Sequence, residues 1–238
     1  MKTLGIDLAS AAEKTAWCSV QWSAGAAAVS ALQVGADDEA LVAAAAAVDH
    51  VGVDAPLGWP RAFVRMLQEP PRPFAWPGER NLLRYRETDR FVHRATGLWP
   101  LSVSSDLIGV VAMRCRGLLA RLSAAGRSCL EVYPAVALHQ WRIEPRGYKG
   151  PRKRDELGRR VDALCAHAGW LSLSARFEAM VRSSDDAFDA LLASLAVRAE
   201  VAGHVLDEHR CPDGEAAEEG WIVLPAPGSL PQLANEPA

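Results

Sequence analysis

The sequence has no long hydrophobic run, although half of its 238 residues are hydrophobic. Its longest uncharged apolar stretch, residues 41–48, is much shorter than the ~20 residues that a membrane-spanning helix needs. Near the N-terminus, the acidic Asp7 stands where a secretion signal would require apolar residues. We therefore expect a cytoplasmic protein that has no membrane partner.

Cysteine is scarce and scattered. The chain has five cysteines, an odd number, and no Cys-x-x-Cys pair. This pattern argues against a disulfide framework and against a thiolate zinc site. Charged residues make up 23% of the chain, which is the composition of an ordinary globular protein rather than a disordered one. No internal repeat or linker divides the sequence, so we expect residues 1–238 to form a single domain.

The charge of the chain is unevenly distributed, although the net charge is only −3. Residues 142–160 hold eight Arg or Lys against three acids, and residues 80–94 hold five Arg against two acids. The C-terminal residues 205–238 hold seven acids and one Arg. Basic patches on an acidic protein can face a phosphate backbone, and they can equally be solvated helix faces.

The first part of the chain alternates apolar stretches in the order strand, strand, strand, helix, strand. The residue patterns predict strands over 3–9, 15–22 and 26–34, a helix over 37–48 and a strand over 51–54. Because the turns that follow Ala9 and Trp22 are short, the first three strands should form an antiparallel meander.

The remaining chain begins with a segment, residues 59–127, whose composition differs from that of the first part. Residues 59–127 are rich in Trp, Arg and Pro at their start, which favours a mostly helical insertion beside the core. The sequence predicts further helices over 79–96, 105–125, 155–168 and 184–205, strands over 128–133 and 220–224, and a loose tail over 226–238.

Acidic side chains end three of the apolar strands. These are Asp7, Asp54 and Glu131, and such positions are unusual because burying an unpaired carboxylate is costly. Neighbouring parallel strands bring their carboxyl ends to one edge of a sheet, so we expect the three acids to converge. Asp186 and Asp189 are three residues apart on one face of a later apolar helix, and we expect them to reach the same edge.

Clustered carboxylates repel one another unless a cation neutralises them. Their hard oxygen atoms suit Mg²⁺ or Mn²⁺. We predict that Asp7, Asp54, Glu131 and Asp189 hold two such ions, with Asp186 as a further catalytic acid. Two ions about 4 Å apart can activate a water and stabilise the leaving oxygen of a phosphodiester. Each acid alone has a structural alternative: Asp54 could cap a turn before Pro56.

Six short motifs occur in an order that resembles one family. They are Gly5-Ile6-Asp7-Leu8-Ala9, Val51-Gly52-Val53-Asp54-Ala55-Pro56-Leu57-Gly58, Glu131-Val132-Tyr133-Pro134-Ala135, Tyr148-Lys149, Asp185-Asp186-Ala187-Phe188-Asp189-Ala190 and Glu219-Gly220-Trp221-Ile222. The sequence resembles the predicted nuclease family known as domain of unknown function 429. More widely, it is similar to RNase H-like nucleases such as bacterial Holliday-junction resolvases.

The resemblance implies an α/β fold with an RNase H-like mixed sheet flanked by helices. It also implies hydrolysis of DNA or RNA. In the wider group an acid on the first strand pairs with one on the fourth strand and an Asp on the last helix. Asp7, Asp54 and Asp189 match that pattern, whereas Glu131 is particular to the smaller family.

Four further residues are candidates for contacting the substrate. Arg86 and Arg90 lie in the predicted insertion, and Lys149 lies in the basic stretch of residues 142–160. An arginine can bind a phosphate bidentately and a lysine acts as a point charge. Their alternative is a salt bridge to one of the acids. Tyr133 could stack on a base or pack against Trp141.

Two other functions share features with this sequence. Actin and sugar-kinase-like phosphotransferases have the same sheet order, but residues 8–12 lack the glycines that cradle phosphates in that group. A non-catalytic nucleic-acid-binding module would be expected to lose a central acid, and none is missing here. The leading hypothesis is a divalent-metal-dependent nuclease.

Overall fold

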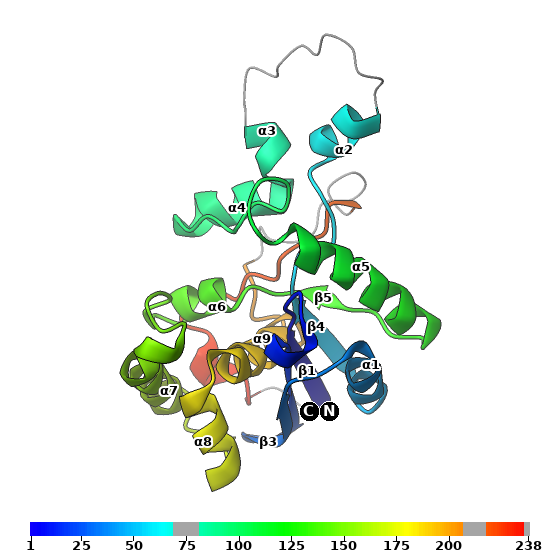
Figure 1. The fold of residues 1–238 in the computed structure, drawn as a ribbon. Coiled ribbons are helices and arrows are strands. Elements are labelled where there is room, and N and C mark those ends of the chain that lie inside the picture. The colour runs from blue at the N-terminus through cyan, green and yellow to red at the C-terminus, as the bar shows by residue number, and fades with distance from the viewer. Residues whose placement is uncertain (69–80, 207–217, 236–238) are drawn as a thin grey trace.

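The protein is built on a six-stranded mixed sheet that has helices on both faces (Figure 1). The structure, a computed structural model, describes residues 1–68, 81–206 and 218–235. The strand order is β5-β4-β1-β2-β3-β6. The strands are β1 (Lys2–Asp7), β2 (Ala16–Ser23), β3 (Ala26–Val34), β4 (His50–Asp54), β5 (Leu130–Glu131) and β6 (Leu171–Ser172). This mixed α/β architecture confirms the predicted fold class and is compatible with an RNase H-like fold.

The meander predicted from the short turns is present. Strands β1 and β2 pair antiparallel, as do β2 and β3. Only a short 3₁₀ turn, Ala12–Lys14, separates β1 from β2. Strand β4 returns through helix α1 (Asp38–Ala46) to pair parallel with β1, and β5 pairs parallel with β4. Three neighbouring parallel strands therefore end at one edge of the sheet.

The other helices cover the two faces of the sheet or belong to the insertion. They are α2 (Arg61–Gln68), α3 (Asn81–Arg84), α4 (Glu87–Thr96), α5 (Gly109–Ala124), α6 (Pro134–Gln140), α7 (Arg154–His167), α8 (Ala175–Ser183) and α9 (Asp185–Val201). Helices α1 and α5 pack on one face, against β1 residues such as Leu4 and Ile6. Helices α6 to α9 pack on the opposite face. No helix in the described part of the chain is long and apolar enough to cross a membrane.

Helix α9 lies unusually close to the sheet because two glycines face it. A Cβ atom on Gly5 would lie 2.2 Å from the Ala190 carbonyl oxygen and 2.2 Å from the Ser194 nitrogen. A Cβ atom on Gly52 of β4 would lie 2.4 Å from a methyl group of Val197. The absence of side chains at these two strand positions lets α9 cross β1 and β4 at backbone distance.

Most of the described residues between 59 and 127 are helical. Helices α2, α3 and α4 lie beyond the end of the sheet at which β4 leads into α2 (Figure 1). The helix predicted over 79–96 is two helices, α3 and α4, with Tyr85 and Arg86 between them. Residues 69–80 of the insertion lie outside the described residues.

The C-terminal segment differs from the prediction of a loose tail. Leu230, Leu233 and Ala234 are buried in the core on the α9 side. Within residues 226–238, the last three lie outside the described residues. The buried Arg198 of α9 donates from Nε to the Leu233 carbonyl oxygen, 2.8 Å away. The strand predicted over 220–224 is reduced to a parallel bridge between Ile222 and Glu131. Hydrophobic residues in the tail therefore cover the end of α9.

Candidate metal site

Asp7 and Asp54 stand side by side at the carboxyl ends of two paired strands. The parallel register of β1 and β4 places their Cα atoms opposite each other. Within each strand, Asp7 follows Gly5 at a spacing of two and Asp54 follows Gly52 at the same spacing. Because alternate residues of a strand share a face, both carboxylates lie on the face that α9 covers.

Helix α9 supplies the third carboxylate. Its N-cap Ser184 accepts a hydrogen bond from the Ala187 backbone N–H, which sets the start of the helix. Asp189 follows about one turn later and is 1% exposed. Carboxylate oxygens of Asp7, Asp54 and Asp189 all lie within 4.8 Å of one another. The structure therefore brings together three of the residues that the sequence predicted as metal ligands.

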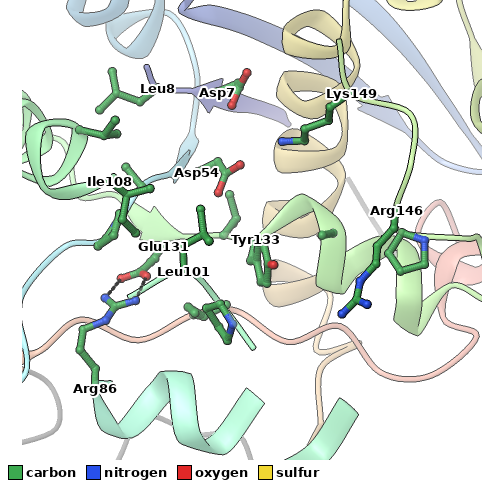
Figure 2. Close-up of a pocket in the computed structure, with 18 of the residues that line it drawn as sticks. Asp7, Leu8, Asp54, Arg86, Leu101, Ile108, Glu131, Tyr133, Arg146 and Lys149 are labelled. Carbon is green, nitrogen blue, oxygen red and sulfur yellow. Dashed lines mark hydrogen bonds and ion pairs between the residues drawn. The ribbon is translucent and has the colours of Figure 1, made fainter. Parts of the chain in front are cut away.

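A loop that precedes α7 closes over this cluster from one side. The Tyr148 hydroxyl donates to Asp189 Oδ1 at 2.6 Å, and the Lys149 Nζ lies 2.5 Å from Asp189 Oδ2. The Gly150 backbone N–H donates to Asp185 at the start of α9, 3.0 Å away. Figure 2 shows the Lys149 amine pointing towards Asp7 and Asp54. Lys149, a predicted substrate contact, is therefore also the cation closest to Asp189 in the described chain.

The pKa values of all three carboxyl groups are raised. Burial raises the pKa of Asp7 well above its usual value, and the charges of Asp189 and Asp54 raise it further. Burial raises the pKa of Asp54 to about 7, even though Lys149 opposes the shift. Burial also raises the pKa of Asp189, against the charge of Lys149 and the Tyr148 hydrogen bond. One ammonium group does not offset three carboxylates this close together, of which Asp189 is buried and the other two are half-buried, so this site favours additional positive charge.

Glu131 does not join the cluster, and the reason is its register. In the pairing of β4 with β5, Glu131 lies opposite Val53 rather than Asp54. Since neighbours in register share a face, its side chain leaves the sheet on the opposite face from Asp54. Figure 2 shows the Glu131 carboxylate directed away from Asp54 and towards Arg86. The prediction that Glu131 ligates the same metal therefore differs from the structure.

The Glu131 carboxylate is instead engaged in a buried ion pair. Arg86 donates to both of its oxygens, at 2.8 and 2.6 Å, and also to both oxygens of Asp89. The Leu57 backbone N–H donates to Glu131 Oε2 at 3.0 Å. The pair thus connects the loop that follows Asp54 to the start of α4. Arg86, expected at the substrate, is 1% exposed and its guanidinium is fully used within the protein.

The remaining predicted residues fall in different places. Asp186 is half-buried beside Asp185, outside the group of three close carboxylates. Arg90 donates to the Tyr85 carbonyl oxygen and pairs with Glu87, and it does not line the cavity described below. Arg94 pairs with the same Glu87. The excess positive charge of residues 80–94 is thus largely neutralised by ion pairs in the part of this segment that the structure describes.

A cavity of about 500 Å³ opens beside Asp7 and Asp54 (Figure 2). Of the predicted substrate contacts, Arg86, Tyr133 and Lys149 line it, and Arg90 does not. Sequence reasoning missed Arg146, which also lines it, and Tyr148, which holds Asp189. The cluster of basic residues over 142–160 was a signal for Arg146, and the Tyr-Lys pair was a signal for Tyr148.

Comparison with known proteins gives a family without an assigned activity. No curated protein is significantly similar to the chain. Residues 5–217 match the model of a family described as protein of unknown function (DUF429). The match includes Asp7, Asp54 and Asp189 and covers most of the sequence. The chain therefore belongs to the DUF429 family.

Proposed function

We propose that this protein is a divalent-metal-dependent phosphodiesterase that hydrolyses nucleic acid. The observation that carries the proposal is the convergence of Asp7, Asp54 and Asp189 within 4.8 Å at the carboxyl edge of a mixed sheet. An arrangement of three carboxylates around one point, with little positive charge from the protein, suits hard divalent cations. The resemblance to RNase H-like nucleases supports the same reading of these three positions.

The donor set fits Mg²⁺ or Mn²⁺. Asp7, Asp54 and Asp189 would hold the metal, and Asp7 on the central β1 is the best placed to be shared between two ions. When bound, such ions activate water and stabilise the charge that develops on a phosphoryl group. The residues of the chain orient the site: Tyr148 and Lys149 fix Asp189, and the Lys149 amine is close enough to contact a phosphate.

Glu131 and Arg86 line the same cavity but lie outside the group of three close carboxylates, and they support it indirectly. By accepting from the Leu57 N–H, Glu131 fixes the loop that follows Asp54, and Arg86 fixes Glu131. We therefore assign both a positioning role, in place of the metal-binding and substrate-binding roles predicted from the sequence.

The phosphotransferase alternative has less support. Between Asp7 and β2 the chain forms a short 3₁₀ turn, and no glycine lies in residues 8–15 to cradle phosphates. Thermal stabilisation by ATP would favour that alternative over the nuclease.

A cleavage assay tests the proposal. The protein is incubated with single-stranded, duplex and branched DNA and RNA in Mg²⁺, Mn²⁺ or EDTA. We expect metal-dependent cleavage that Asp54→Asn reduces at least about 100-fold, since loss of a metal ligand removes most metal-dependent catalysis. The matched control is Asp155→Asn, an exposed acid on α7, which should cleave like the wild type. Equal cleavage by Asp54→Asn, or cleavage in EDTA, would contradict the proposal.

A further inference from the structure

The cavity beside the aspartates has an apolar wall that metal binding does not require. Leu8 and Ile108 lie on one side of the Asp7 and Asp54 carboxylates and Tyr133 lies on the other (Figure 2). Leu101 also lines the cavity and is 58% exposed. A volume of about 500 Å³ lies within the ~300–1,000 Å³ range of pockets that enclose a small ligand. The wall therefore offers a place for an apolar, flat group next to the acids.

Cationic side chains stand on one side of the same cavity. Arg146 and Lys149 line it, and Arg146 is exposed. The chain continues from there into exposed Arg152, Lys153 and Arg154, at the start of α7. A ligand that combines an apolar ring with a chain of negative charges matches this combination. A nucleotide within a polynucleotide strand has both features, because its base has an apolar face and its phosphates carry the charge.

The described part of the insertion offers little to a double helix. Arg86 is buried in its ion pair, and Arg90 and Arg94 share Glu87. A duplex also stacks its bases inside and presents only their edges, so it cannot place a base face on Leu101 or Tyr133. Recognition by base stacking requires nucleotides that are unpaired.

We propose that this cavity binds one unpaired nucleotide of a single-stranded segment, with its base on the wall formed by Leu8, Leu101, Ile108 and Tyr133. The adjoining phosphates lie at Arg146 and Lys149, which brings the next phosphodiester to the aspartates. The inference rests on the proposed function for cleavage at the aspartates, whereas binding of the single strand does not depend on it. It narrows the substrate class to single-stranded nucleic acid or single-stranded regions of branched nucleic acid.

Binding is measured by fluorescence anisotropy with the Asp7→Asn protein in EDTA, so that cleavage cannot intervene. The probes are a fluorescein-labelled single-stranded oligonucleotide and the same oligonucleotide annealed into a blunt duplex. We expect the single strand to bind at least about tenfold more tightly than the duplex. In the same background, Leu101→Asp should weaken single-strand binding about tenfold, because it places a charge on the base site. Leu107→Asp is the matched control: Leu107 is 100% exposed and does not line the cavity, so binding should not change.

Each outcome bears on the inference separately from the nuclease proposal. Equal binding of the two probes, or equal effects of the two leucine substitutions, would overturn the inference even if the wild type cleaves nucleic acid with Mg²⁺. A free mononucleotide that competes as effectively as the oligonucleotide would also overturn it, because the strand would then contribute nothing. Single-strand binding without cleavage in any metal would uphold the inference and contradict the proposed function.

Discussion

Asp7, Asp54 and Asp189 are held close together by elements that are far apart in the sequence. Their raised pKa values mean that holding these three groups in their charged forms destabilises the metal-free protein. Without a bound cation, carboxyl groups of this kind stabilise the folded state only while they are protonated. That stability is present below their unfolded pKa of 3.8 and is lost as the pH rises through the folded pKa, which is about 7 for Asp54.

Asp7→Asn should therefore stabilise the metal-free protein at alkaline pH. The substitution removes one of three mutually repelling charges and leaves the size of the side chain nearly unchanged. We expect a gain of about 0.5–2 kcal/mol near pH 8, the usual range for a stabilising substitution, and little gain near pH 4, where the raised pKa keeps Asp7 protonated. Urea unfolding at the two pH values in EDTA measures the difference. A destabilised variant at pH 8 would indicate that the Asp7 carboxylate already has sufficient partners within the protein.

Metal affinity should depend on pH in the same range. Since a bound cation requires Asp54 in its charged form, binding releases a proton when the pH is below its pKa of about 7. We expect the dissociation constant for Mn²⁺ to fall at least about tenfold per pH unit from about pH 5 to about pH 7, because the pKa values of Asp7 and Asp189 are raised as well. Isothermal titration calorimetry gives this constant directly. An affinity that does not vary over this range would mean that Asp54 is not a ligand.

Helix α9 can place Asp189 beside β1 only because Gly5 has no side chain. In Gly5→Ala, the new methyl group would meet backbone atoms of Ala190 and Ser194, which cannot rotate away. We expect a loss of about 1–3 kcal/mol or more in the free energy of unfolding, together with weaker Mn²⁺ binding, because α9 must move away from the sheet.

Gly117→Ala is the matched control for this substitution. Gly117 lies within α5, and a Cβ atom there would meet nothing within 4 Å. The alanine should stabilise the protein by about 0.5–1 kcal/mol, as expected for glycine to alanine in a helix. If both substitutions had the same effect, the close approach of α9 to β1 would not matter to stability.

The ion pair of Arg86 and Glu131 connects α4 and β5 to the loop that follows Asp54. Arg86→Lys keeps the charge but cannot satisfy Glu131, Asp89 and the Glu219 carbonyl oxygen together. We expect a loss of about 1–3 kcal/mol, because at least one of these buried acceptors is left without its hydrogen bond. Arg94→Lys is the control, because its pair with Glu87 is largely exposed and should change stability by less than about 1 kcal/mol. Similar losses for the two variants in thermal or urea unfolding would contradict this role.

Sequence patterns predicted the elements whose residues alternate clearly. The meander, α1, β4 and the apolar helix that carries Asp189 were all predicted from local periodicity and turn residues. Helix α6 and the two-residue strand β6 were not predicted, because segments this short carry little periodicity. Burial of the tail was also missed, since isolated leucines such as Leu230 and Leu233 do not reveal which surface they cover.

In the whole molecule, the ends of β1, β4 and β5 meet at one edge, as the sequence predicted. The sequence did not predict towards which face of the sheet each acidic side chain points. Asp7 and Asp54 were predicted to converge because parallel strands end at one edge, and they do. Glu131 was grouped with them for the same reason. Its direction depends on the register between β4 and β5, a pairing of only two residues that no local pattern reveals. Arg86 was similarly assigned to the substrate because its charge was visible in the sequence and its buried partner was not.

The proposed chemistry requires a divalent cation at the point where β1, β4 and α9 meet. The most direct measurement is anomalous X-ray diffraction from crystals of the wild-type protein soaked in Mn²⁺, at a pH above about 7 where Asp54 is charged. We predict an anomalous peak about 2.1–2.2 Å from carboxylate oxygens of Asp7, Asp54 and Asp189. No peak among these three side chains, with Lys149 still bound to Asp189 at saturating Mn²⁺, would contradict a metal site at these residues.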